Sequence, residues 1–184
     1  YRDQRIGLEE QERAGRLLNA ALDAGINFLD TAECYGVSEE LIGQYVSHRR
    51  GEFILATKAG HVSGGCSGEP WTAQTVADSI DRSLVRMKTG YVDIVQLHAY
   101  DAPRPPPDEV VQAVVDAKEA GKTRFVGFSD ENEEAEWAIE SGLFDTLQTS
   151  FSLVDQRARY GLLQAARSKG VGIIGKRPIA NAVW

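Results

Sequence analysis

The chain has 184 residues, of which 42% are hydrophobic and 26% are charged, and this composition is typical of one soluble globular domain. It carries 20 Lys and Arg residues against 27 Asp and Glu residues, and a net charge of -7 argues against non-specific binding to nucleic acid. No apolar run approaches the roughly 18 residues of a membrane-spanning helix, and no signal peptide opens the sequence. The length and the absence of a linker favour a single domain over residues 1–184. Cys34 and Cys66 are too few for a disulfide framework, so we expect the protein in a reducing cytoplasm.

Helical and strand-like patterns alternate along the whole chain. Apolar residues recur at helical spacing in six segments, and short apolar runs typical of strands lie between them. The predicted helices cover 8–24, 38–50, 72–89, 108–121, 131–142 and 155–170, and the predicted strands cover 26–30, 53–58, 91–98, 123–129, 145–151 and 171–177.

Strands that alternate with helices favour a parallel sheet with right-handed crossovers. An open doubly wound sheet and a (β/α)8 TIM barrel both fit this pattern. No G-x-G-x-x-G motif and no P-loop follows a strand, since the nearest imitation, GGCSG at 64–68, is far from a suitable strand-to-helix turn. The positions of the ionisable residues favour the barrel.

Three successive predicted strands end in ionisable residues. Asp30, Lys58 and His98 are the last residues of these strands, and the alternation of side chains along each strand puts all three on one face. In a barrel such residues converge at the carboxyl-terminal mouth, where catalytic groups lie. Tyr35 follows Asp30 by five residues, in the loop above the same mouth.

These residue types suit the transfer of a proton to a carbonyl oxygen. A Tyr phenol has an ordinary pKa of about 10, too high for a good general acid at neutral pH, and a neighbouring ammonium lowers it. A carboxylate keeps the Lys charged and oriented, and a His can donate a hydrogen bond to the carbonyl oxygen. The pattern therefore predicts a site that protonates a carbonyl oxygen while hydride reaches the carbonyl carbon.

The stretch GINFLDTAECYG, followed by ATKAG and VDIVQLH, closely resembles the aldo-keto reductase family, and the resemblance continues through GKTRFVGFS, LQTSFS and KRPIA. It implies a (β/α)8 barrel that binds NADPH without a Rossmann motif. It also implies a catalytic tetrad of Asp30, Tyr35, Lys58 and His98. In this tetrad Tyr35 is the proton donor, Lys58 and Asp30 lower its pKa, and His98 orients the carbonyl.

The resemblance further implies a set of cofactor contacts, with departures from the family pattern. Ser129 and Gln148 match positions that hold the nicotinamide carboxamide. Asp130 stands where the family often has Asn, and Lys176 stands where an aromatic ring commonly stacks on the nicotinamide. Since a Lys cannot stack in that way, we expect Lys176 and Arg177 to contact a cofactor phosphate or the substrate.

The largest departure concerns the ends of the barrel. The family's first strand is missing before residue 8, and its eighth strand is missing after residue 184. Six strands cannot close an eight-stranded barrel, and the two end strands would have unpaired edges. We therefore expect an incomplete TIM barrel with strands two to seven, and favour a sequence that is part of a longer polypeptide over a real truncation.

The function expected first is an NAD(P)H-dependent oxidoreductase that reduces an aldehyde or ketone, a small-molecule carbonyl compound, to an alcohol. The alternative, motivated by Asp130, Lys176 and the missing strands, is a non-catalytic or regulatory barrel that binds nucleotide or a partner without turnover. A metal-dependent hydrolase is disfavoured because three His residues in separate contexts form no ligand cluster. His48 and His61 have no partner context and are expected at the surface. The sequence does not specify an oligomeric state.

Overall fold

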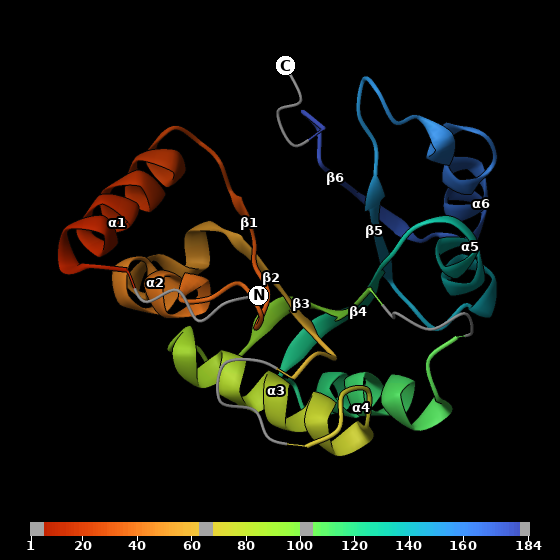
Figure 1. Cartoon of the computed structure of the whole chain (residues 1–184), viewed down its shortest axis with the longest axis horizontal. Helices are drawn as coiled ribbons and strands as arrows, with labels where there is room; N and C mark the ends of the chain where they lie inside the picture. Colours follow the sequence, from red (N-terminus) through yellow and green to blue (C-terminus); the bar gives the residue numbers. More distant parts are fainter. Residues whose placement is uncertain (1–5, 63–67, 100–104, 181–184) are drawn as a thin grey trace.

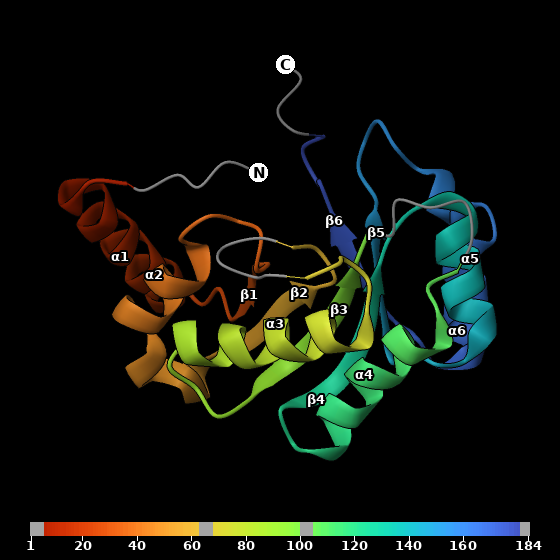
Figure 2. The same ribbon diagram turned by 60° about the horizontal axis from the view of Figure 1, so that its bottom comes forward.

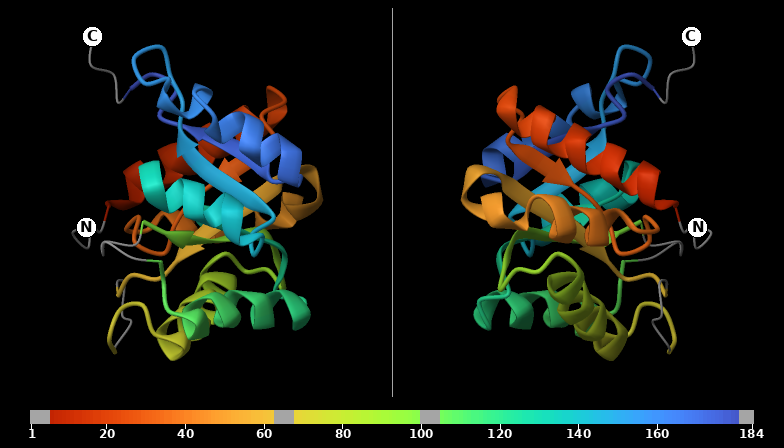
Figure 3. Two further views of the ribbon diagram at one scale, coloured as in Figure 1. Left: turned by 90° about the vertical axis from the view of Figure 1, so that its right-hand side faces the viewer. Right: turned by 90° about the vertical axis from the view of Figure 1, so that its left-hand side faces the viewer.

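Six parallel strands form one curled sheet in the computed structural model, which describes residues 6–62, 68–99 and 105–180. The strands pair strictly in chain order and run in one direction (Figure 2). They are β1 (Phe28–Asp30), β2 (Ile54–Ala59), β3 (Val92–His98), β4 (Thr123–Ser129), β5 (Thr146–Ser150) and β6 (Gly172–Lys176). The sheet curls into a half-barrel with helices outside it (Figures 1 and 3), which confirms the prediction of an incomplete (β/α)8 barrel.

The helices alternate with the strands and cover the convex face of the sheet (Figure 1). They are α1 (Leu8–Asp23), α2 (Ser38–Tyr45), α3 (Ala73–Arg86), α4 (Asp108–Glu119), α5 (Asn132–Ser141) and α6 (Leu162–Lys169), with short 3-10 helices η1 (Ser47–Glu52) and η2 (Arg157–Arg159). In the described ranges no helix is long and apolar enough to cross a membrane, and no group of three His, Cys, Asp or Glu side chains is placed to hold a metal ion.

The hydrophobic core lies between the helices and the convex face of the sheet. Leu55, Leu97 and Phe128 point outward from β2, β3 and β4 and are at most 1% exposed. They pack in one cluster with apolar residues of the helices, such as Ile80 of α3 and Val114 of α4. Because successive side chains of a strand point to opposite faces, this packing directs the intervening polar residues to the concave face.

Two predicted elements near the amino terminus have different bounds in the structure. The predicted strand 26–30 is shorter, because the N–H of Ile26 bonds to the carbonyl oxygen of Ala21 at 3.0 Å and so completes the end of α1. The predicted helix 38–50 divides into α2 and η1. The backbone of Val46 has a φ of -135° between them, outside the helical region.

The predicted helix 155–170 begins late, as α6. Gly161, directly before α6, has a φ of 113°, which a helix cannot continue through. Upstream of it, the carboxylate of Asp155 accepts hydrogen bonds from the backbone N–H and the guanidinium of Arg157. These bonds hold the segment in a turn that contains η2 rather than in a regular helix.

Candidate active site

The carboxyl ends of β1, β2 and β3 bring the predicted tetrad residues together. Parallel pairing sets Asp30 beside Ala56, and Lys58 beside Gln96. His98 ends β3 beside Ser129 of β4. All of these positions have the parity of the concave face, so the strand register alone concentrates the ionisable side chains at one edge of the sheet.

The buried Lys58 forms an ion pair with Asp30. Its Nζ lies 2.7 Å from Oδ2 of Asp30 and 2.8 Å from the carbonyl oxygen of Thr31. The Lys58 side chain is 2% exposed, whereas that of Asp30 is 30% exposed. Burial lowers the pKa of Lys58, and the Asp30 carboxylate opposes this effect by favouring the ammonium. The pair therefore presents a fixed cation at the base of the site.

Tyr35 lies above this cation. The Nζ of Lys58 is 5.1 Å from the centre of the Tyr35 ring, a distance at which the ammonium and the ring attract each other. The ring also meets His98 edge-on, with centroids 5.8 Å apart and an interplanar angle of 82°. Tyr35 is 37% exposed, so it combines contact with Lys58 and access from the mouth.

His98 is half-buried and uncharged at neutral pH. Burial, followed by the charges of Lys58, His61 and Lys176, lowers its pKa to about 3. Its Nδ1 lies 3.5 Å from Sγ of Cys34. Burial raises the pKa of the Cys34 thiol, which therefore keeps its proton. A thiol that donates to Nδ1 leaves the imidazole proton on Nε2, ready to be donated to a carbonyl oxygen.

The expectation that His61 is a surface residue without partners is wrong. It is half-buried, and its ring centre lies 5.1 Å from that of His98 and 5.7 Å from that of Trp71. The turn at Gly60, with a φ of 128°, allows this packing, since a Cβ there would lie 2.8 Å from the Trp71 ring. Its position three residues after Lys58 was the sequence signal that could have placed His61 near the site. His48 is exposed, as predicted.

Asp30 also joins the tetrad to the predicted carboxamide-binding residues. Ser129 Oγ donates to Oε1 of Gln148 at 3.1 Å, and Nε2 of Gln148 donates to Asp30 at 3.0 Å. Nε2 of Gln96 donates to the other carboxylate oxygen of Asp30 at 3.3 Å. Sequence reasoning missed Gln96 as a site residue, although alternation places it on the same face two positions before His98.

The concave face fits a nicotinamide. The hydroxyl of Ser129 and the side-chain amide of Gln148 lie side by side and offer both donors and acceptors, which complement a carboxamide. Within the part of the chain that the structure describes, buried Oε1 of Gln96 and Oγ1 of Thr146 have no hydrogen-bond partner. Ser129 and Gln148 would hold the carboxamide.

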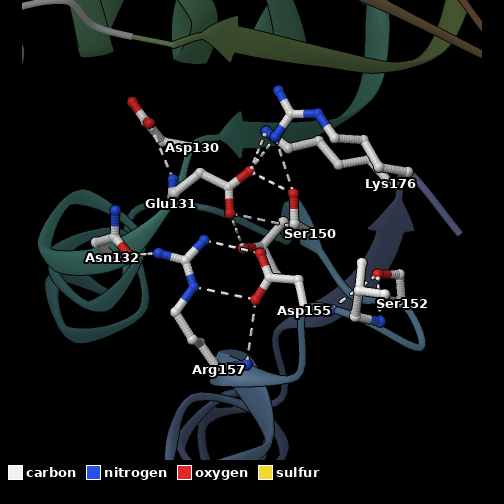
Figure 4. Close-up of polar contacts among 11 residues, drawn as sticks. Asp130, Glu131, Asn132, Ser150, Ser152, Asp155, Arg157 and Lys176 are labelled. Atoms are coloured by element: carbon white, nitrogen blue, oxygen red, sulfur yellow. Dashed lines mark hydrogen bonds and ion pairs between the residues drawn. The ribbon is translucent and has the colours of Figure 1, made fainter. Parts of the chain in front are cut away.

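Lys176 and Arg177 stand at the end of β6, apart from the Asp30–Lys58 pair. Lys176 pairs in register with Ser150 of β5. Its Nζ lies 3.2 Å from Glu131, and Nη1 of Arg177 lies 3.0 Å from the same carboxylate (Figure 4). Oδ1 of Asp130 accepts the N–H of Glu131 at 2.9 Å. Sequence reasoning named the two cations but missed Glu131, their shared partner.

Comparison with known proteins gives one family. Residues 4–183 match the model of the Aldo/keto reductase family, and the chain therefore belongs to it. An uncharacterised oxidoreductase of Bacillus subtilis, YqkF, is 32% identical over 181 residues, which cover 95% of this chain and 58% of that protein. The chain thus spans less than two thirds of the length of this relative.

Two solved structures agree with this assignment. The holo form of the aldo-keto reductase AKR11C1 from Bacillus halodurans has a TM-score of 0.83 and 27% identity, over 93% of this chain and 59% of that one. An aldo-keto reductase from Klebsiella pneumoniae in complex with NADPH has a TM-score of 0.80 and 25% identity, over 96% of this chain and 61% of that one.

Proposed function

We propose that this protein reduces an aldehyde or ketone to the alcohol with NADPH and that Tyr35 supplies the proton. The observation that carries the proposal is the convergence of Tyr35, Lys58, Asp30 and His98 at one edge of the sheet, from three strands and one loop. Membership of the Aldo/keto reductase family supports the general reaction class.

Each side chain has a separate part in the proposed reaction. Bound NADPH supplies a hydride to the carbonyl carbon. Tyr35 gives its hydroxyl proton to the carbonyl oxygen, and the Lys58 ammonium stabilises the phenolate that remains. Asp30 keeps Lys58 charged and in place, and His98 orients the carbonyl oxygen through Nε2–H. The phenolate then regains a proton from solvent, which is possible because Tyr35 is partly exposed.

The proposed cofactor contacts lie on β4, β5 and β6 and directly after β6. Ser129 and Gln148 hold the nicotinamide carboxamide, and Lys176 and Arg177 contact a phosphate group of the cofactor or an anionic group of the substrate. NADPH is proposed rather than NADH because a solved relative of similar fold binds NADPH.

The test is turnover of a panel of aldehydes and ketones by the purified chain, with NADPH that carries deuterium at the transferable position of the nicotinamide. Mass spectrometry of the alcohol shows whether deuterium reaches the carbinol carbon. Deuterated product supports the proposal. Binding of NADPH without turnover of any carbonyl compound would support the nucleotide-binding form of the non-catalytic alternative instead. A protein that neither binds NADPH nor turns over would contradict both the proposal and that form.

A further inference from the structure

The carboxylate of Glu131, to which the proposed function gives no role, lies at the centre of a cationic cluster (Figure 4). Its Oε1 lies 3.2 Å from Nζ of Lys176 and 3.0 Å from Nη1 of Arg177, and it accepts the hydroxyl of Ser150 at 2.7 Å. Its Oε2 accepts the backbone N–H of Ser150 and the hydroxyl of Thr149, each at 3.3 Å. Five donors thus converge on one carboxylate.

The donors come from different strand ends. Glu131 follows β4, Ser150 ends β5 and Lys176 ends β6. The backbone of Arg177 turns back with a φ of 57°, and Nη1 of its guanidinium also lies 3.0 Å from the hydroxyl oxygen of Ser150. An ammonium, a guanidinium, a hydroxyl and a backbone N–H around one point are the donor set that proteins use for phosphate groups. The Glu131 carboxylate is itself an oxyanion in that position.

We propose that Lys176, Arg177 and Ser150 form a phosphate-binding site and that the Glu131 carboxylate occupies this site until the phosphate displaces it. The identity of the phosphate, on the cofactor or on a phosphorylated carbonyl substrate, rests on the proposed function, whereas the anion site itself does not. Glu131 is thereby a residue that sets the affinity for the anion.

The charges and the exposure of the cluster favour exchange. Lys176 and Arg177 carry two positive charges and Glu131 only one negative charge, so a phosphate group of about two charges neutralises the cations more completely. The side chains of Glu131 and Lys176 are 21% and 19% exposed, and that of Arg177 is 51% exposed. Exchange therefore requires no opening of the hydrophobic core.

The structure also offers a second position for the displaced carboxylate. A cavity of about 190 Å³ adjoins Glu131 and is lined by Asn132, Thr149, Asp155 and Arg157 among others. The guanidinium of Arg157 lies in this cavity wall, bonded to Asp155 and to Asn132 (Figure 4). The hydrogen bond from Arg157 to Asp155 is the main cause of the raised pKa of Arg157, and the charge of Glu131 adds to it, so a Glu131 carboxylate rotated toward this cavity still faces a cation.

Lys176 links this anion site to the tetrad. The charge of Lys176 contributes to the lowered pKa of both Lys58 and His98, behind the larger effect of burial in each case. Its ammonium therefore lies close enough to act on the tetrad electrostatically.

The test is a titration of the purified chain with inorganic pyrophosphate, followed by ³¹P NMR and calorimetry. Glu131→Gln keeps the length and the acceptor oxygen of the side chain but removes the competing charge, so we expect affinity to rise about tenfold. Glu140→Gln is the matched control, because it removes the same charge from an exposed side chain of α5 that does not line the cavity beside Glu131. Its affinity should equal that of the wild type. Lys176→Met should weaken binding in either background.

Unchanged or weaker pyrophosphate binding by a folded Glu131→Gln variant would overturn the proposal, since Glu131 would then only clamp the three strand ends. If Glu131→Gln does not fold, the Lys176→Met variant still decides, because pyrophosphate binding that survives the loss of Lys176 also overturns the proposal. Pyrophosphate binding by a chain without reductase activity would keep the anion site and reject the proposed function.

Two further titrations distinguish the sources of the phosphate. If the phosphate belongs to the cofactor, Glu131→Gln raises the affinity for NADP⁺, and pyrophosphate competes with NADP⁺. If it belongs to the substrate, the variant lowers KM for glyceraldehyde 3-phosphate and leaves KM for glyceraldehyde unchanged.

Discussion

Two lysine–carboxylate pairs lie at the carboxyl ends of the strands, and they differ in depth. Nζ of Lys58 is 2.7 Å from Asp30, and the Lys58 side chain is 2% exposed. Nζ of Lys176 is 3.2 Å from Glu131, and the Lys176 side chain is 19% exposed. Lys58 also donates to the fixed backbone oxygen of Thr31.

The difference in depth separates two uses of the same chemical pair. Removing Asp30 would leave the Lys58 ammonium without solvent or counter-ion, so Lys58 must stay with Asp30, although the Asp30 carboxylate itself is partly exposed. An ammonium that water reaches, such as that of Lys176, loses little when its partner leaves, because solvent replaces the lost partner. The deep pair therefore suits a fixed electrostatic role beside Tyr35, and the shallow pair suits exchange of one anion for another.

The largest expected effect concerns Tyr35, whose ring contacts Lys58 of the deep pair. Tyr35→Phe should lower kcat about 10²- to 10⁴-fold, the usual contribution of a general acid, and should leave NADPH affinity unchanged. Steady-state kinetics and a fluorescence titration measure the two quantities. The control is Tyr91→Phe, because the Tyr91 hydroxyl bonds to Arg124 at the opposite ends of the strands. A Tyr35→Phe variant with full activity would contradict the assignment of the proton donor.

The second prediction compares the pairs by stability. Asp30→Asn should lower the free energy of unfolding by about 3 kcal/mol, because the Lys58 ammonium, 2% exposed, keeps the carbonyl oxygen of Thr31 but loses its counter-ion. Urea unfolding of the variant and of the Asp30→Asn, Lys58→Met double variant gives the value. The double variant should be more stable than Asp30→Asn alone. A loss below about 1 kcal/mol in the single variant would mean that depth does not distinguish the pairs.

A third prediction rests on Glu33, which lies two residues before Tyr35 in the loop between β1 and α2. Its side chain is buried, and Oε2 accepts the hydroxyl of Ser79 on α3. Burial, followed by the like charge of Glu39, raises its pKa to about 7, although Ser79 and Arg82 oppose the shift. The other carboxylate oxygen of Glu33, buried in the described structure, has no hydrogen-bond partner.

Glu33 and His98 should change stability with pH in opposite directions. The folded state keeps Glu33 protonated to about pH 7 against an ordinary pKa of 4.5, so this contribution is complete below pH 4.5 and lost as the pH rises to 7. His98, with a folded pKa of about 3 against 6.5, contributes fully above pH 6.5 and loses this as the pH falls. The two contributions to stability largely cancel between about pH 4.5 and pH 6.5.

Single variants remove the cancellation. Relative to Glu33→Gln, the wild type should gain up to about 3 kcal/mol of unfolding free energy as the pH falls from 7 to 4.5. Relative to His98→Asn, it should lose up to about 3 kcal/mol as the pH falls from 6.5 to 4.5. Urea unfolding at several pH values measures both differences. A difference that does not vary with pH would contradict the assigned protonation state of that residue.

The deep pair could be predicted from the sequence, and most of the shallow pair could not. Alternation along apolar strands places Asp30 and Lys58 on one face, because only one parity lets the core residues pack against helices. Glu131 lies in a loop that has no periodicity, and its partners Ser150 and Arg177 are 19 and 46 residues further along the chain. Such contacts depend on how three strand ends meet, which no local pattern specifies.

The same contrast explains the errors in element bounds. The bounds of the strands that pack against the helices were predicted closely, because the burial of their apolar residues determines where they begin and end. The end of α2 depends on one residue, Val46, whose backbone leaves the helical region before η1 begins. The start of α6 depends on the conformation of Gly161, a residue that the helical pattern includes without distinction.

The smallest expected effect tests the shallow pair directly. Lys176→Met should lower the free energy of unfolding by less than about 1 kcal/mol, because Arg177 and Ser150 still hold the Glu131 carboxylate. Salt at about 1 M, where the screening length is roughly 3 Å, should remove most of that difference, whereas the larger effect of Asp30→Asn should persist because the Lys58 ammonium is only 2% exposed. Urea unfolding of both variants at low and high salt makes the comparison. If Lys176→Met proved as costly as Asp30→Asn at both salt concentrations, Lys176 and Glu131 would be a structural pair, and the carboxylate could not give way to a phosphate.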